Sequence, residues 1–207
     1  MSDYVTVKKA ASDEFTEKRS RFIGHIMPVK SREEAEEFIA SIKSKYWDAR
    51  HNVYAYVLRD GNIQKYSDDG EPQGTAGVPV LEVLLKEGVT DCVVVVTRYF
   101  GGILLGTGGL TRAYSKSAKI AIEAGGRKNM LYCDELLIKC DYAFYGVLGS
   151  LLPAFDAVTV SEEFTDLITL RVAVRKADTA RFIAEVIDRS GGRVTPEPVG
   201  EGYFEGK

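Results

Sequence analysis

Five glycines lie within nine residues, at positions 101, 102, 106, 108 and 109, inside the stretch VVVVTRYFGGILLGTGGLTRAYSKSA. Glycine leaves the backbone bare, so several N–H groups can turn toward one bound group, and the first turn of a helix adds a partial positive charge. Arg98 before the glycines and Arg112 after them could add charge-assisted hydrogen bonds to a phosphate. The spacing therefore predicts an anion-binding loop. Its predicted binding residues are Arg98, Gly101, Gly102, Gly106, Thr107, Gly108, Gly109, Thr111 and Arg112.

The named phosphate motifs do not fit this loop. A Walker loop needs a lysine after its last glycine, and a dinucleotide fingerprint needs a glycine where Thr111 stands. We therefore expect no cofactor. A purely structural interpretation stays open, because glycines also permit positive φ angles and close packing of a helix on a sheet.

A second dense segment, YSDDGEPQGTAGVPV at residues 66–80, is polar and rich in Gly and Pro, which is typical of a surface loop. Asp68, Asp69 and Glu71 could bind a magnesium ion, and Glu71 or His51 could act as a general base. Consecutive carboxylates in a turn are usually only solvated, and the spacing of a calcium loop is absent. We therefore assign no metal ion and no catalytic residue, and keep these three carboxylates as weak metal candidates.

Aromatic residues near these segments have two interpretations. Tyr54 and Tyr56 would share one face of a strand, where they could stack on bases if exposed. For Trp47 and Tyr46 we expect packing at the end of a helix.

The elements that must position these residues follow from hydrophobic periodicity. In the first part of the chain we expect strands at 22–29 and 51–58, and helices at 31–46, 78–88 and 108–125. Ser31 and Glu34 should form the capping box of the first helix, and Gly125 should end the last one at its C′ position. The run of β-branched residues from Asp91 to Thr97 predicts a central strand buried on both faces.

The segment GGRKN at residues 125–129 predicts a domain boundary, with domains at 1–127 and 132–207. After it the order strand, helix, strand, strand, helix, strand is typical of a ferredoxin-like split βαβ sandwich. Its elements are expected at 135–140, 142–152, a hairpin within 156–174, a helix from Asp178 to Gly191, and an edge strand at 193–199. The predicted fold class is α+β.

Charge differs between the two predicted domains. Residues 1–129 contain 19 Lys and Arg against 17 Asp and Glu, a balance of +2, whereas residues 130–207 contain 8 against 13, a balance of −5. This asymmetry is compatible with an anionic partner for the first domain. No apolar run is long enough for a membrane span and no secretory signal is visible, so we expect a cytoplasmic protein without a membrane partner. The three cysteines lack metal-site spacing and are expected to be structural thiols.

Four segments together resemble the IMPACT (YigZ-like) family: KRSRFIGHI, ARHNVYAY, SDDGEPQGTAGVPVL and VVVTRYFGGILLGTGGLTRAYS. The resemblance implies an N-terminal fold like the second domain of small-subunit ribosomal protein five and domain IV of elongation factor G. It implies a C-terminal ferredoxin-like domain similar to domain V of that factor. Eukaryotic members regulate translation through an additional N-terminal domain without a counterpart in these 207 residues, and bacterial members are suspected of binding RNA or the ribosome.

The leading hypothesis is therefore a non-enzymatic, translation-associated regulator that binds RNA or the ribosome, with Lys18, Arg19 and Arg21 extending the basic surface of the glycine loop. One alternative is an enzyme that binds a phosphate ligand in the glycine loop with a metal held by carboxylates. Another is a protein–protein adaptor. If the carboxylate loop, which contains Asp68, Asp69 and Glu71, folds within reach of the glycine loop, a metal and phosphate site is favoured. If the two loops diverge across an open basic face, RNA binding is favoured.

Overall fold

The computed structural model describes residues 2–206 and has a mixed α+β fold. Its internal contacts divide it into an N-terminal unit, residues 5–128, and a C-terminal unit, residues 129–206 with residues 2–4. No helix among the described residues is long and apolar enough to cross a membrane. That the two units fold as separate domains stays a prediction. Limited proteolysis tests it, since preferred cleavage outside residues 125–129 would contradict it.

The N-terminal unit is built on a five-stranded antiparallel sheet of order β2-β3-β6-β4-β5. Its strands are β2 (Ala11–Glu17), β3 (Ser20–Pro28), β4 (His51–Leu58), β5 (Ile63–Ser67) and β6 (Cys92–Tyr99). The prediction of a central strand buried on both faces is confirmed for β6. Its Val94 and Val96 belong to one hydrophobic cluster, and its Val93 and Val95 belong to a second.

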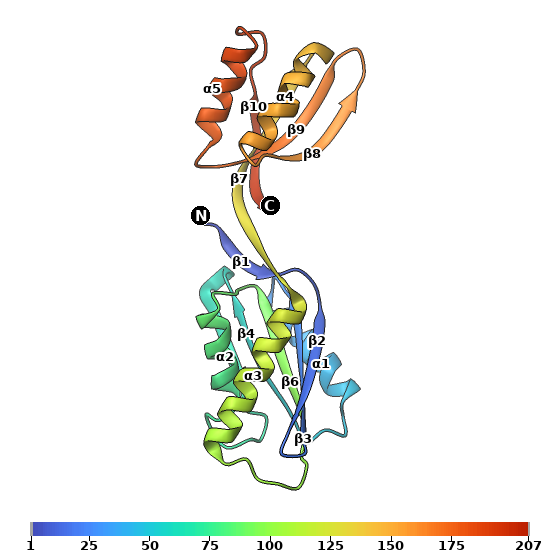
Figure 1. The fold of residues 1–207 in the computed structure, drawn as a ribbon, viewed down its shortest axis with the longest axis vertical. Helices are drawn as coiled ribbons and strands as arrows, with labels where there is room; N and C mark the ends of the chain where they lie inside the picture. Colours follow the sequence, from blue (N-terminus) through green and yellow to red (C-terminus); the bar gives the residue numbers. More distant parts are fainter. Residues whose placement is uncertain (1, 207) are drawn as a thin grey trace. The chain divides into compact units, whose positions relative to one another are not determined.

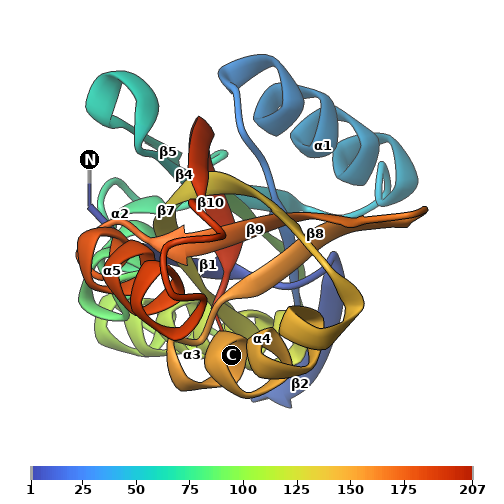
Figure 2. The same ribbon diagram turned by 90° about the horizontal axis from the view of Figure 1, so that it is seen from above.

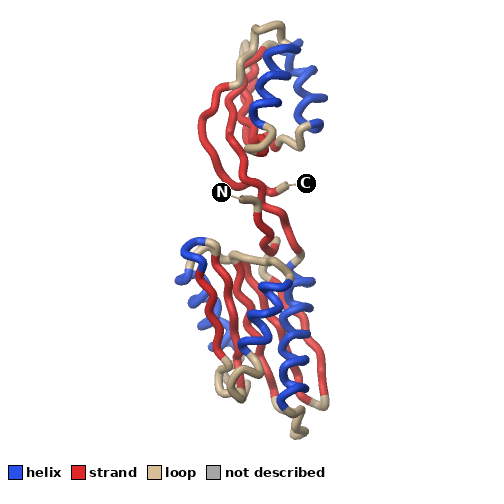
Figure 3. The backbone as a smooth tube through the Cα atoms, turned by 90° about the vertical axis from the view of Figure 1, so that its left-hand side faces the viewer, coloured by secondary structure: helices blue, strands red, loops and turns tan. Residues whose placement is uncertain are grey.

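Helices cover both faces of this sheet (Figure 3). Helix α1 (Arg32–Lys45) lies on one face and begins at Ser31, whose hydroxyl accepts a hydrogen bond of 3.2 Å from the backbone N–H of Glu34. The predicted capping box is only half formed, because the Glu34 carboxylate accepts from the N–H of Lys30 rather than from that of Ser31.

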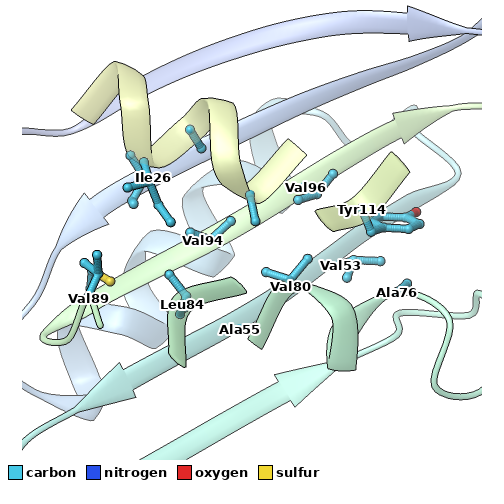
Figure 4. Packing of buried hydrophobic residues seen from close by; sticks show 14 of the residues in the cluster. Ile26, Val53, Ala55, Ala76, Val80, Leu84, Val89, Val94, Val96 and Tyr114 are labelled. Atoms are coloured by element: carbon cyan, nitrogen blue, oxygen red, sulfur yellow. The ribbon is translucent and has the colours of Figure 1, made fainter. Parts of the chain in front are cut away.

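Helices α2 (Gly77–Lys86) and α3 (Thr107–Gly125) lie on the opposite face. Figure 4 shows Val80 and Leu84 of α2 in the cluster that they form with sheet residues. The prediction that Gly125 lies at the C′ position after α3 is wrong. Gly125 is the last residue of α3, buried where a Cβ atom would lie 2.9 Å from Ile26, and Gly126 caps the helix with a φ of 65°.

The C-terminal unit has the predicted ferredoxin-like topology, with strand order β10-β7-β9-β8 and the short strand β1 (Tyr4–Val7) also paired with β7. Seen from above, α4 and α5 lie on the same side of its strands (Figure 2). Ile168, Leu170, Val172 and Val174 of β9 are fully buried, as their alternation predicts. The elements are β7 (Arg127–Cys140), α4 (Tyr142–Ala154), β8 (Val158–Phe164), β9 (Ile168–Arg175), α5 (Thr179–Arg189) and β10 (Glu197–Glu205).

Several sequence-based boundaries were wrong. Strand β7 begins at Arg127, inside the segment GGRKN, rather than at residue 135. Helix α4 was expected to end at residue 152, before Pro153, but it continues to Ala154 with Pro153 in its last turn. The final strand begins after Pro196 rather than at Arg193. The strands β1, β2 and β5 were not predicted.

Candidate functional site

The glycine loop, residues 100–106, connects the end of β6 to the start of α3 and lies at the same end of the sheet as the β2–β3 turn (Figure 1). Gly106 occupies the N-cap position with a φ of 72°, and no side chain caps the helix. The first N–H groups of α3 therefore lack the side-chain acceptor that usually satisfies them. The structure thus has the uncapped helix N-terminus that the anion-site prediction requires.

The fold itself explains most of the glycines in this segment. A Cβ atom at Gly101 would lie 2.1 Å from the backbone oxygen of Arg19, so only glycine lets the two loops touch. Gly106 has a positive φ angle, and at Gly109 a Cβ atom would lie 3.0 Å from Leu105. Gly108 differs, because a Cβ atom there would meet no atom within 4 Å and its φ angle is ordinary. Nothing in the fold requires a glycine at position 108.

Arg98 does not end the strand as a free cation. It is 5% exposed, and its Nη1 atom lies 2.5 Å from Oε1 of Glu71. Its guanidinium carbon lies 5.4 Å from the ring centre of Phe22 and 5.6 Å from that of Phe100. Its Nε atom is enclosed and has no hydrogen-bond partner among the described residues. Arg98 is therefore part of a buried charge cluster.

Glu71 is the centre of that cluster. Besides Arg98, its Oε1 atom accepts a hydrogen bond of 2.7 Å from the Tyr114 hydroxyl and lies 3.8 Å from Nε2 of His51. Burial, followed by the negative charge of Glu71, raises the pKa of Tyr114 far above its usual value, so this hydroxyl stays protonated and donates. Nδ1 of His51 lies 2.8 Å from the carbonyl oxygen of Asp69; since a carbonyl only accepts, Nδ1 carries the proton.

This cluster forms the polar side of a cleft of about 410 Å³. The cleft is bounded by the carboxylate loop, the start of β4, the glycine loop and the first turn of α3. Its lining includes His51, Glu71, Arg98, Phe100, Leu104 and Thr107. The carboxylate loop and the glycine loop therefore do fold within reach of each other.

A second hollow, of about 210 Å³, lies between the β2–β3 turn and α3. Lys18, Arg112 and Lys116 line it together with Glu17 and Phe15. The three cations are exposed and form no ion pair with any residue that the structure describes. Arg98 and Arg112, which we predicted to hold one anion, thus line two different hollows.

The remaining predicted basic residues have different surroundings. Arg19 is exposed in the β2–β3 turn with a φ of 65°, whereas Arg21 lies 2.6 Å from Glu14 in an ion pair. The side chain of Thr107 lies at the first cleft, while Thr111 is partly buried and lines neither hollow.

The weak metal candidates have other partners. Asp68 accepts hydrogen bonds from the N–H groups of Ala76 and Gly77 with Oδ1 and from that of Gly74 with Oδ2, which fixes the start of α2. Asp69 binds Lys43 at 2.6 Å and the N–H of Asn52 at 2.7 Å. Within residues 2–206 no group of three or more His, Cys, Asp or Glu side chains could hold a metal ion.

The aromatic expectations were partly wrong. Tyr56 is fully buried under α1 and cannot stack on a base, and Trp47 is 82% exposed rather than packed. Sequence reasoning also missed Ser20 and Tyr114, whose partners lie far away in the sequence. Lys116 could have been found, because it follows Arg112 by four residues on the helix.

Comparisons with known proteins agree with the resemblance. Residues 18–122 match the model of the Impact N-terminal domain, and residues 138–193 match that of a domain of unknown function, DUF1949. IMPACT family member YvyE of Bacillus subtilis (strain 168) is 38% identical over 194 residues, which cover 93% of this chain and 89% of the relative. IMPACT family member YigZ of Escherichia coli (strain K12) is 36% identical over 178 residues, covering 84% and 87%.

More distant and structural relatives agree with this. Protein IMPACT of Rattus norvegicus is 35% identical over 95 residues, 44% of this chain and 30% of the relative. A solved structure of a hypothetical protein has a TM-score of 0.61 at 33% identity and covers 96% of this chain and 98% of its own. Since a family model matches half of the chain and relatives at 36–38% identity span most of it, the chain belongs to the IMPACT family.

Proposed function

We propose that this protein is a non-enzymatic, translation-associated regulator that binds RNA, free or within the ribosome, through the glycine-loop end of its N-terminal unit. One observation carries the proposal. Five exposed cations gather there without an ion pair to any described residue: Lys18, Arg19, Arg50, Arg112 and Lys116. They come from the β2–β3 turn, the start of β4 and the first turns of α3, around an uncapped helix N-terminus.

The free charge of these cations is what a phosphate backbone needs. Elsewhere in the same unit, several cations are neutralised by carboxylates, for example Arg59 by Asp91 at 2.9 Å and Arg127 by Glu87 at 2.5 Å. A cation already paired contributes less to phosphate binding, because its carboxylate must be displaced first. Contacts between unpaired cations and phosphates dominate the affinity of proteins for nucleic acids and make it depend on salt.

The test is a matched pair of triple variants in the full chain. Lys18→Ala, Arg112→Ala and Lys116→Ala together remove the cations of the second hollow. Lys9→Ala, Lys30→Ala and Lys86→Ala remove the same charge near the opposite ends of β2, β3 and α2. These three side chains are also exposed and form no ion pair with any described residue.

Binding of fluorescent RNA hairpins and of purified bacterial ribosomes is then measured at several salt concentrations. We expect the first triple to weaken binding at least tenfold and to flatten the salt dependence by two to three units of log–log slope, at about 0.7–0.9 per phosphate contact. The second triple should change the affinity less than threefold. Equal losses in the two triples, or binding that does not respond to salt, would refute the proposal.

A small-ligand enzyme is a second candidate, because the carboxylate loop and the glycine loop line one cleft. The shared cleft favours the ligand site of such an enzyme. It does not favour a metal ion, since the carboxylates of Asp68 and Asp69 are already bound by protein groups. Calorimetric titration with Mg²⁺ tests the metal part. Saturable binding that Asp68→Asn and Asp69→Asn abolish would support this candidate over a metal-free binding protein.

A further inference from the structure

We propose that the cleft between the carboxylate loop and the glycine loop binds a single nucleotide, with the base between apolar side chains and the phosphate at the start of α3. The nucleotide can be a free nucleoside monophosphate or one unit of a bound RNA, since both present the same chemistry. The free-nucleotide form is independent of the proposed function, whereas the RNA form rests on it.

The first support is an unused acceptor on a buried acid. The side chain of Glu71 is 3% exposed, and all of its contacts involve Oε1. Oε2 accepts no hydrogen bond from any described residue, yet it is not among the enclosed atoms without a partner, which are Tyr56 Oη and Arg98 Nε. Because Glu71 lines the cleft and Oε2 is not fully enclosed, the proposal assigns Oε2 as the acceptor for an N–H donor on the edge of a base.

The second support is the charge cluster itself. Burying an arginine and a glutamate costs more desolvation than apolar side chains of similar size would, so a buried pair is weak support for stability. Buried charged groups that line a cleft are instead a frequent feature of functional sites. Arg98 and Glu71 are both buried and both reach the cleft wall.

The third support is the apolar part of the cleft lining, which begins beside that cluster at Phe100. Phe100 is 42% exposed and Leu104 is 81% exposed, and both line the cleft with Leu105 and Leu110. Large apolar side chains exposed together on one surface commonly mark a binding site. Stacking of a base on an aromatic ring is worth about 1–3 kcal/mol, and a cleft of about 410 Å³ lies in the range of small-molecule sites.

The start of α3, where it lines the cleft, provides the anion site. Gly106 and Thr107 at the start of α3 line it, with no side chain capping the helix, and Arg50 lines it as an exposed cation without an ion pair to a described residue. A phosphate bound there would accept from the first N–H groups of α3, from the Thr107 hydroxyl and from Arg50. The lining of the cleft therefore contains an acceptor, an apolar surface and an anion site, which are the groups that the base and phosphate of a nucleotide require.

The experiment titrates the full chain with adenosine and guanosine 5′-monophosphate, with the two nucleosides, and with inorganic phosphate, by calorimetry. We expect the monophosphates to bind at least fivefold more tightly than either the nucleosides or inorganic phosphate. Phe100→Ala and Leu104→Ala should each weaken monophosphate binding about tenfold. Ile103→Ala is the matched control, because Ile103 lies in the same loop and is 41% exposed but does not line the cleft; it should change binding less than twofold.

The same variants separate the two sources of the nucleotide. If Phe100→Ala and Leu104→Ala also weaken RNA binding while Ile103→Ala does not, the nucleotide belongs to the RNA; if only monophosphate binding weakens, it is free. Loss of RNA binding in the Lys18, Arg112 and Lys116 triple with intact monophosphate binding would show that the two sites act separately.

Three outcomes would overturn the proposal. The first is that the cleft variants weaken neither ligand, the second is that Ile103→Ala weakens binding as much as Leu104→Ala, and the third is that inorganic phosphate binds as tightly as the nucleotides. Because Leu104 is almost fully exposed, Leu104→Ala keeps the test valid even if Phe100→Ala lowers stability.

Discussion

Arg98 and Arg112 flank the same five glycines, but one is buried and the other is exposed. Arg98 lies near the end of β6, which pairs with β3 on one side and β4 on the other. Its guanidinium is near the rings of Phe22 and Phe100 and lies 2.5 Å from the Glu71 carboxylate. Arg112 lies on the solvent side of the first turns of α3 and has no carboxylate partner among the described residues. The two arginines that flank this loop therefore have different roles. Arg98 holds loops together, whereas Arg112 remains available to a ligand.

The difference shows that the partner decides the role of a charged residue. Glu71 lies 27 positions before Arg98 in the sequence, in a loop that looks like a solvated turn. The pairing arises because the carboxylate loop and the end of β6 meet at one end of the sheet. Removing each arginine in turn is therefore the most direct way to test the contrast.

The largest expected effect is on stability, in Arg98→Met. Removing one partner of a buried ion pair typically costs about 3–5 kcal/mol, because the remaining charge stays buried without compensation. Arg112→Met should change the free energy of unfolding by less than about 0.5 kcal/mol, as is usual for exposed positions. Urea unfolding of the two variants measures both values.

A double variant separates the pair from general packing. If Glu71 and Arg98 stabilise each other, Glu71→Leu combined with Arg98→Met should cost clearly less than the sum of the single changes. Strictly additive costs, or similar stability of the Arg98 and Arg112 variants, would mean that the burial contrast has no energetic consequence.

Much of the fold could be predicted, because the spacing of hydrophobic residues along the sequence shows which face of a helix or strand is buried. The β-branched run of β6 and the alternation of β9 both gave strands with the predicted faces. The strand β2, with the sequence ASDEFTE, could not be predicted because it lies at the sheet edge and, of its residues, Ala11 and Phe15 alone pack against the core. An edge strand is held mainly by backbone hydrogen bonds to its neighbour. These bonds place little constraint on the side chains, so the sequence of the strand gives little sign of them.

Less of the candidate site could be predicted. Glycine spacing located the loop and the helix start, since both depend on local backbone geometry. The division of Arg98 and Arg112 between two hollows, and the hydrogen bond from Tyr114 to Glu71, depend on contacts between segments 27 and 43 residues apart. Long-range pairing of polar groups has no periodic pattern in a single sequence.

The two histidines extend the contrast between enclosed and accessible groups. His25 is buried, with Nε2 3.3 Å from the Thr97 hydroxyl, whereas His51 lines the open cleft. Burial, and to a lesser extent the charge of Lys45, lowers the pKa of His25 from 6.5 to about 4. The imidazole of His25 is therefore harder to protonate in the folded protein than in the unfolded chain.

We expect this difference to make stability depend on pH. Between pH 6.5 and about 4 the unfolded chain binds a proton that the folded chain does not, so stability falls as pH is lowered through this window and levels off below it. The total is about 3 kcal/mol at 1.36 kcal/mol per pKa unit. Urea unfolding of the wild type and of His25→Gln at several pH values isolates this contribution. The free energy of unfolding of the wild type minus that of the variant should fall as the pH is lowered toward 4. A difference that does not change with pH would contradict the lowered pKa.

We expect Arg112→Ala to lower the affinity for RNA, by a smaller free energy than the stability changes above. The loss of one charge-assisted contact should weaken binding about tenfold and reduce the log–log salt slope by about 0.7–0.9. Lys86→Ala is the control, because Lys86 near the C-terminal end of α2 is also exposed and has no ion pair with a described residue. Lower affinity with an unchanged salt slope would show that Arg112 does not contact a phosphate.

The smallest effect is expected in Gly108→Ala, and it decides what the one unexplained glycine does. Position 108 has an ordinary φ angle and open space for a Cβ atom, and alanine favours helix by up to about 1 kcal/mol over glycine. Stability should therefore stay constant or rise slightly, as thermal unfolding will show.

If position 108 is bare so that an anion can approach the N–H groups of α3, the added methyl group should weaken RNA binding about threefold, despite the gain in stability. Gly74→Ala is not a suitable control, because its φ of 74° would strain any side chain. Gly146→Ala is suitable, since it too lies in a helix with open space around it, but in the other unit. If Gly108→Ala and Gly146→Ala both leave binding unchanged, the bare backbone at the start of α3 serves no ligand, and the uncapped helix end is a feature of the fold alone.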